Sequence, residues 1–294
     1  MAGGAAARGD GGHPRQRGPC VMRRIRRSAR PITRLVQRIG LCALLALSAA
    51  PSPAAAQTPY GDDELIQGFL LTVFGAEVGS TPRDIEAASV VKKFTGPVSY
   101  TIVSATRPNQ SASVRAFMAE LSGAVEGLTL VEAAPGEDPA MTVFLVARRD
   151  YVPTIRAKVW PGVDTAFLES NACSAVIAAR RAGIEKAFVF LVADEGFLPL
   201  AHCMVEEIAQ SLGPANDSDL LPDSIFNDSS DVNVFSVFDW YILNMLYDPR
   251  VQAGMTIDQV SAILPAVIAD ARLRLPEIMA HRPAIAAHAA FTRP

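Results

Sequence analysis

Two adjacent glutamates, Glu206 and Glu207, could act as acid–base catalysts or metal ligands, and they lie in a stretch whose pattern predicts a helix. Gln210 follows one helical turn later, and Asn216 and Asp217 come after a Gly-Pro stop. Residues three or four positions apart share one helix face, so Glu206 and Gln210 would project together. A positioned carboxylate can act as a general base toward a water molecule. This stretch therefore predicts a cleft beside a helix.

The spacing resembles that of metzincin-type zinc peptidases, in which H-E-x-x-H on a helix is followed by x-x-G-x-x-H. Here Glu206, Gln210 and Asn216 stand at the three histidine positions, and Glu207 stands at the position of the general base. Imidazole suits zinc, whereas amide carbonyls bind it poorly. The resemblance therefore implies a zincin-like domain that lacks the zinc ligands, with Glu207 catalytic only if the domain is active.

Because histidine ligands are missing, we expect no bound cofactor. Calcium or another divalent metal is the alternative left open, because such ions take several oxygen ligands, including carboxylates. Asp217 and Asp219 would have to supply carboxylates beside Glu206, and the loop does not match an EF-hand. The competing interpretation is that these acidic residues are solvated or cap a turn, which favours a non-catalytic domain.

The first 56 residues have the features of a targeting segment. Seven arginines between positions 23 and 38 precede the apolar run Leu41–Ala50, and Ala54–Ala56 forms a small-residue cleavage pattern. We place the translation start at Met22 and cleavage near Ala56, giving a periplasmic or secreted protein. A lipid anchor on Cys42 is disfavoured, because the apolar run follows this cysteine.

Charge and cysteine usage differ sharply beyond residue 56. The first 56 residues hold ten arginines and one aspartate, leaving 17 basic against 29 acidic residues, or a net charge of −12. Such a surface repels nucleic acid, which we exclude as a partner. No further run reaches the ~18 apolar residues of a membrane span. Cys173 and Cys203 remain after cleavage, and we predict a disulfide between them, with a thiolate ligand or nucleophile as the alternative.

Periodicity predicts an α+β fold with a mixed sheet. The metzincin resemblance implies that this fold is zincin-like (metzincin-like), with a mixed twisted sheet, an active-site-type helix and C-terminal helices. We place one domain at residues 57–275 and a loosely ordered tail at 276–294, and we expect residues 150–169 to be irregular. The expected helices are 62–74, 111–126, 199–212, 235–246 and 257–273. The expected strands are 98–103, 128–132, 142–147 and 187–193, with 173–179 either an edge strand or a helical turn.

A second resemblance covers most of the mature chain. The residues that carry it are Cys203, Glu206, Glu207, Gln210, Gly213, Asn216, Asp217, Ser224–Asp228, Leu246–Arg250, Gly254 and Met255. Together they resemble domain of unknown function 2927, a proteobacterial family of exported proteins and lipoproteins. The resemblance implies an envelope location and no particular reaction. We expect a non-catalytic binding protein with an unknown protein or envelope partner. The alternatives are a hydrolase using Glu207 with a non-zinc metal, and a purely structural envelope protein.

Overall fold

The computed structural model describes residues 60–75, 88–163, 165–227 and 234–281. The predicted targeting segment and residues 282–294 of the predicted tail lie outside these ranges. The strands are β1 (Val98–Ser104), β2 (Leu130–Glu132), β3 (Met141–Val146), β4 (Cys173–Arg180) and β5 (Gly183–Val192). The helices are α1 (Asp62–Val73), α3 (Ser111–Ala124), α4 (Arg148–Lys158), α5 (Thr165–Ser170), α6 (Phe197–Gln210), α7 (Val237–Tyr247), α8 (Ile257–Ser261) and α9 (Leu264–His281).

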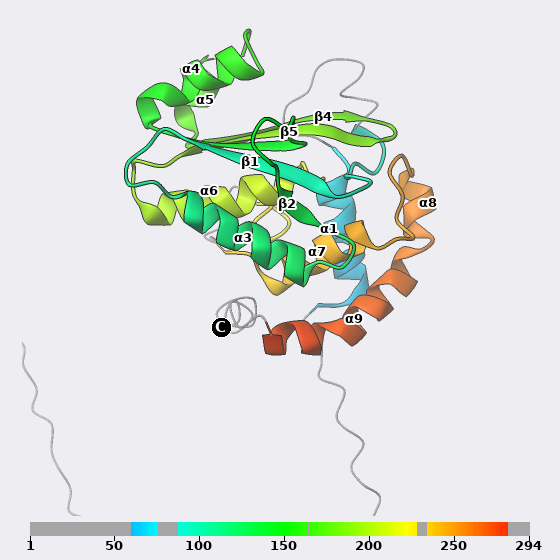
Figure 1. Ribbon diagram of the computed structural model, residues 1–294. Coiled ribbons are helices and arrows are strands. Elements are labelled where there is room, and N and C mark those ends of the chain that lie inside the picture. Colours follow the sequence, from blue (N-terminus) through cyan, green and yellow to red (C-terminus); the bar gives the residue numbers. More distant parts are fainter. Residues whose placement is uncertain (1–59, 76–87, 164, 228–233, 282–294) are drawn as a thin grey trace, which may run out of the picture. The chain divides into compact units, whose positions relative to one another are not determined.

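The strands form one mixed sheet in the order β2-β1-β3-β5-β4 (Figure 1). The pairs β1–β2, β1–β3 and β3–β5 are parallel, and β4 runs antiparallel to β5 at the edge. Parallel neighbours need a crossover, which α3 supplies between β1 and β2. The α+β class and the mixed sheet are therefore confirmed, and residues 173–180 form the edge strand.

Alternate residues of β3 and β5 pack on opposite faces of the sheet, because strand side chains alternate in direction. Val143 and Leu145 join the larger core, which includes residues of α1, α3, α6, α7 and α9. Phe144 joins a smaller core on the other face, where its ring stacks on that of Phe190 at 4.9 Å between centroids. Tyr151 of α4 belongs to this smaller core. Both faces of these strands are covered, which explains their continuous apolar sequence.

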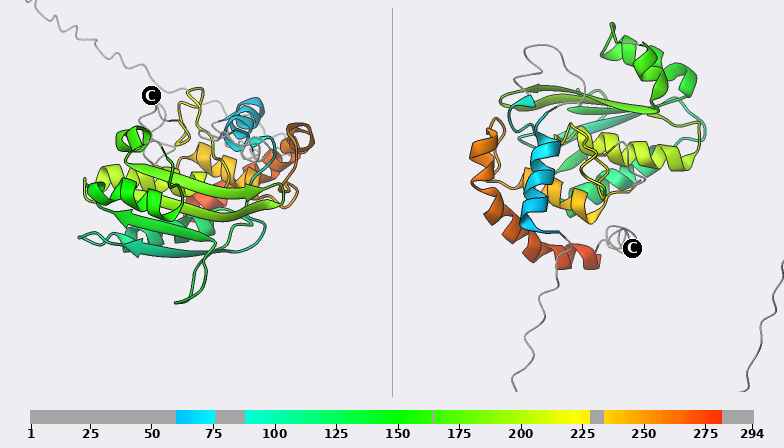
Figure 2. Two further views of the ribbon diagram at one scale, coloured as in Figure 1. Left: turned by 90° about the horizontal axis from the view of Figure 1, so that it is seen from above. Right: turned by 180° about the vertical axis from the view of Figure 1, so that it is seen from behind.

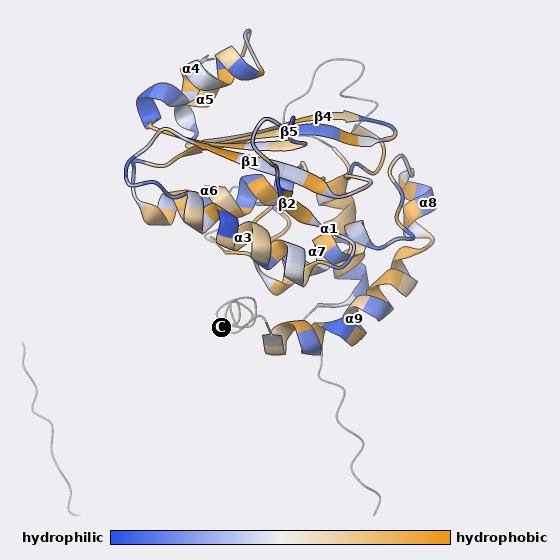
Figure 3. Cartoon of the chain, viewed as in Figure 1, coloured by the Kyte–Doolittle hydropathy of each residue, from blue (hydrophilic) through white to orange (hydrophobic). Residues whose placement is uncertain are grey.

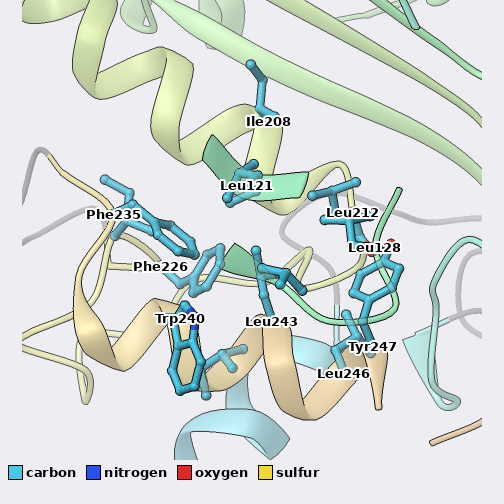
Figure 4. Close-up of a cluster of buried hydrophobic side chains, with 14 of the residues drawn as sticks. Leu121, Leu128, Ile208, Leu212, Phe226, Phe235, Trp240, Leu243, Leu246 and Tyr247 are labelled. Atoms are coloured by element: carbon cyan, nitrogen blue, oxygen red, sulfur yellow. Dashed lines mark hydrogen bonds between the residues drawn. The ribbon is translucent and has the colours of Figure 1, made fainter. Parts of the chain in front are cut away.

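Helix α7 lies in the middle of the larger core, and all of its residues are buried. The indole Nε1 of Trp240 donates a hydrogen bond of 2.7 Å to the carbonyl oxygen of Ala124 at the end of α3. Figure 4 shows Trp240 and Leu243 of α7 among apolar side chains from α3, α6 and the loop after α6. By contrast, α8 and α9 alternate hydrophilic and hydrophobic residues, as expected of helices with one outer face (Figure 3).

Two predictions about helices need correction. Residues 150–169 are not irregular, because they contain most of α4 and most of α5. Helix α4 buries only Tyr151 and Ile155 and contains Pro153, so its pattern is short and interrupted. The predicted helix 257–273 is divided into α8 and α9, and α9 begins just before Pro265, which has no N–H to donate. Helix α9 then continues through residues 276–281, so this part of the predicted tail is helical.

Candidate functional site

Helix α6 carries the predicted site residues and follows β5 after a tight connection. It packs against β4 and β5, on the sheet face opposite α4 (Figures 1 and 2). The chain leaves this helix through Gly213, whose φ of 138° is unfavourable for residues with a Cβ. A Cβ at this position would also overlap the carbonyl oxygen of Lys92. The glycine turn is therefore required by both backbone conformation and packing.

Glu206 and Glu207 are both buried, with 6% and 7% of their surfaces exposed. The Nε2 atom of His202 lies 3.3 Å from the Oε2 atom of Glu206, one turn along the same helix. Oxygens of both glutamates and the Sγ atom of Cys173 lie within 4.8 Å of one another. The charge of Glu207 also adds to burial in raising the pKa of Tyr151. A carboxylate oxygen of each glutamate thus lies close to Cys173 at the start of β4.

The remaining predicted cleft residues make hydrogen bonds within the protein. Gln210 donates from Nε2 to Oδ2 of Asp217 at 2.9 Å. Asn216 donates from Nδ2 to the carbonyl oxygens of Leu71 at 2.8 Å and of Asp217 at 3.1 Å. The structure therefore joins Gln210 to Asp217, whereas the amide of Asn216 is directed to the last turn of α1. Side-chain amides that donate in this way tie α6, the following loop and α1 together.

The predicted disulfide is present between Cys173 and Cys203, whose Cα atoms lie 5.7 Å apart. It joins the edge strand β4 to the middle of α6. Elimination of the two N-terminal cysteines was the signal that predicted this pair. The bond brings the end of β4 next to Glu206 and Glu207.

Asp239 is a buried carboxylate that our reading of the sequence did not identify. Its Oδ1 atom accepts hydrogen bonds from Ser224 Oγ at 2.7 Å and from the backbone N–H of Ile225 at 3.1 Å. Its Oδ2 atom accepts from the backbone N–H of Ser236 at 2.8 Å. Burial raises the pKa of this carboxyl to about 6. The spacing Ser236-x-x-Asp239 is that of a capping box, and this signal could have identified the residue.

Lys92 and Lys93 are also buried functional groups that sequence reasoning missed. Lys92 donates from Nζ to the carbonyl oxygens of Val73 and Gly75, at 2.8 and 3.0 Å. Lys93 donates to those of Leu246 and Val251, at 2.8 and 2.7 Å, with a longer contact to the Asp248 carbonyl. Burial lowers the pKa of both ammonium groups to about 8. No periodic signal marks these two lysines as buried.

With the site described, comparison with known proteins gives one result. The model of a family described as "Protein of unknown function (DUF2927)" matches residues 62–266. The chain belongs to this family. No curated protein and no solved structure matches it. The DUF2927 region begins with α1 and ends near the start of α9, so it includes the whole sheet, α6 and α7.

Residues of the DUF2927 resemblance also lie at a second place, away from α6. Two of them, Tyr247 and Pro249, line a cavity of about 380 Å³ together with Lys93, Gly96 and Gly127. The ammonium of Lys93 is already directed to backbone carbonyls there. We therefore assign these residues to holding the end of α7 against the segment that precedes β1. Among the described residues, no helix of this DUF2927 chain is long and apolar enough to cross a membrane.

Proposed function

We propose that this DUF2927 protein is an exported, non-catalytic domain of zincin-like design that binds a protein or another component of the cell envelope. Its helix α6 keeps the position of an active-site helix, and its loop keeps the glycine turn. The positions that hold zinc ligands in an active metzincin serve here to hold the domain together.

The observation that carries this proposal is the hydrogen bonding of Gln210 and Asn216. Their amide nitrogens donate to Asp217 and to Leu71 of α1, so both side chains are part of the internal framework. An amide nitrogen that donates a hydrogen bond cannot also be a zinc ligand, and amide oxygens bind zinc poorly. Two of the three ligand positions are therefore used for structure.

Two further features support the proposals that the protein is exported and that its domain is zincin-like. A disulfide such as Cys173–Cys203 persists in oxidising compartments and is rare in the cytosol. In addition, β5 is followed directly by α6, and the Ser224–Phe226 turn is held by the buried Asp239. Both features fit an exported domain whose former active-site region has become rigid structure.

The non-catalytic part is tested on the purified, oxidised full chain. Its zinc, calcium and magnesium contents are measured by mass spectrometry, and its hydrolysis of an unfolded protein substrate is compared with that of Glu207→Gln. We expect less than stoichiometric metal and no hydrolysis that depends on Glu207. One bound metal per chain together with hydrolysis lost in Glu207→Gln would overturn the proposal and establish the hydrolase alternative.

The binding part is tested at the start of α6, where Phe197 is 56% exposed and Leu198 is 73% exposed. A photoreactive amino acid is placed at either position in cells, with the exposed Glu185 of β5 as the matched control site. We expect a defined crosslinked partner from positions 197 and 198 but not from position 185. The same set of crosslinks from all three sites, or recovery of the chain in the cytosol with free thiols, would contradict the proposal.

A further inference from the structure

Metal-ligating side chains from two elements meet beside the disulfide, one helical turn before Gln210. The Sγ atom of Cys173 on β4 and carboxylate oxygens of Glu206 and Glu207 lie within 4.8 Å of one another. His202 Nε2 lies 3.3 Å from Glu206 Oε2. Cys203, bonded to Cys173, supplies a second sulfur. This set is separate from the Gln210–Asp217 and Asn216–Leu71 contacts described above.

We propose that reduction of the Cys173–Cys203 disulfide opens a zinc site formed by Cys173, Cys203, His202 and Glu206. Two sulfurs, one imidazole nitrogen and one carboxylate oxygen make a four-ligand set of the kinds that zinc takes. While the disulfide is intact, neither sulfur is available as a thiolate. The bond therefore acts as the gate of the site.

The positions of the ligands fit one ion. His202 and Glu206 are four residues apart on α6, and Cys203 and Glu206 are three apart, so all three project from one side of the helix. Cys173 faces them from the edge strand. With zinc bonds of about 2.0–2.3 Å, the ligand atoms of a tetrahedral site lie roughly 3.3–3.8 Å apart. The separation of 3.3 Å between His202 Nε2 and Glu206 Oε2 already meets this requirement. The Sγ atom of Cys173 lies within 4.8 Å of a Glu206 carboxylate oxygen. After reduction, rotation of the two cysteine side chains would bring both sulfurs into the same tetrahedron.

Burial and charge at this place also favour a cation. The side chain of Glu206 is only 8% exposed, while that of His202 is 35% exposed and leaves a path from solvent. Glu207 adds a second buried carboxylate beside the first. A divalent cation at this place would be attracted by both carboxylate groups.

The chemistry balances with a dithiol as the reductant. Its two sulfurs form their own disulfide and pass two electrons and two protons to Cys173 and Cys203, which become two thiols. When Zn²⁺ binds, each thiol releases its proton and coordinates as a thiolate. Reoxidation by thiol–disulfide exchange would release the ion. This inference does not depend on the proposed non-catalytic function, because that concerns the oxidised protein and rests on Gln210 and Asn216, which are not ligands of this site.

The test uses the full chain in which Cys20 and Cys42 are replaced by serine, so that only the disulfide cysteines remain. Oxidised and dithiol-reduced samples are titrated with Zn²⁺ against a chromophoric chelator, and with Co²⁺ to detect thiolate-to-metal charge transfer. Circular dichroism is recorded on each sample. We expect one tightly bound zinc per reduced chain, none at the same affinity in the oxidised chain, and a charge-transfer band only after reduction.

Variants of the proposed ligands distinguish a four-ligand zinc site from zinc bound by the two thiolates alone. His202→Asn and Glu206→Gln keep both cysteines and should each weaken zinc binding by at least about tenfold in the reduced chain. The exposed Glu169→Gln is the matched control and should bind as the parent does. Equal affinity in all of these variants, or no zinc binding by the reduced chain, overturns the proposal. If the reduced chain loses its circular dichroism signal, recovery on adding zinc supports the site, and failure to recover overturns it.

Discussion

Lys92 and Lys93 are neighbours in the sequence, yet their ammonium groups hold the C-terminal ends of two different helices. Lys92 donates to Val73, the last residue of α1, and to Gly75 just beyond it. Lys93 donates to Leu246 in the last turn of α7 and to Val251 in the segment that follows. The carbonyl groups at the end of a helix have no partner within it and carry partial negative charge, so a cation there is favourable. One dipeptide before β1 therefore positions both helices that flank α6 and its loop.

Replacing either lysine should therefore destabilise the fold. Lys92→Met or Lys93→Met leaves buried carbonyls without their donor, and we expect a loss of about 1–3 kcal/mol in the free energy of unfolding. Urea unfolding followed by circular dichroism measures this loss. Lys158→Met, at an exposed position on α4, is the control and should change stability by less than about 0.5 kcal/mol. Equal effects at all three positions would contradict the assignment.

The same two lysines predict that the free energy of unfolding depends on pH. Their pKa values in the folded protein are about 8, below the usual 10.5. Between these values the unfolded chain binds more protons than the folded chain, so the lysine contribution to stability rises with pH from about 8 to 10. The stability of the wild type relative to Lys92→Met/Lys93→Met should increase across this interval in urea unfolding. A constant or shrinking difference would show that the buried ammonium groups titrate normally.

Asp239 predicts that the stability of the fold depends on pH with the opposite sign, at lower pH. Burial raises the pKa of its carboxyl in the folded protein to about 6 from the usual 3.8, so the folded chain retains a proton that the unfolded chain loses. Its contribution to stability is therefore largest below about pH 4 and decreases as the pH rises to about 6. Asp239→Asn should cost about 1–3 kcal/mol, because its amide would face a backbone N–H. The difference from wild type should narrow between pH 4 and 6.5, and a widening difference would refute this assignment.

Asn216 offers a direct test of the hydrogen bond that joins the loop after α6 to α1. Asn216→Ala removes the hydrogen bond to the Leu71 carbonyl and should cost about 1–2 kcal/mol. Asn216→Asp nearly keeps the size of the side chain but places an acceptor opposite that carbonyl, so it should cost more than alanine. Thermal unfolding ranks the three proteins. If aspartate were tolerated as well as asparagine, the donor role of this amide would be wrong.

Gly213 should be much less tolerant of a side chain than other glycines. Gly213→Ala combines an unfavourable φ with overlap on Lys92, whereas Gly136 has a positive φ but open space around it. Gly162 has open space and no positive φ. We therefore expect the loss of stability to decrease in the order 213, 136, 162, with alanine at 162 close to neutral. Chemical unfolding of the three variants tests this order, and a Gly213→Ala protein as stable as Gly162→Ala would contradict it.

The sequence was most informative where hydrophobic patterns were long. The apolar stretch of β5 and the apolar residues of α7 predicted a strand at 187–193 and a helix at 235–246, and burial on all sides explains why both stretches are so apolar. Tyr151 and Ile155 of α4 were too few to reveal a helix around Pro153. The spacing of Glu206, Gln210 and Asn216 located the region of interest, but spacing cannot show which way an amide donates. The directions of Gln210 and Asn216 depend on α1 and on the loop, which are distant in sequence or irregular.

The β4–β5 hairpin, α6 and the disulfide that joins them occupy one uninterrupted stretch of chain, residues 173–210. Their contacts link residues close in sequence, whereas β1 pairs with β3 only after α3 and β2 have been passed. Contacts between nearby residues form faster than those that close long loops. In a chain that emerges from its N-terminal end, this stretch can be assembled and oxidised before α7, α8 and α9 have emerged. We therefore expect the disulfide to form early in folding, before the C-terminal helices pack against this stretch.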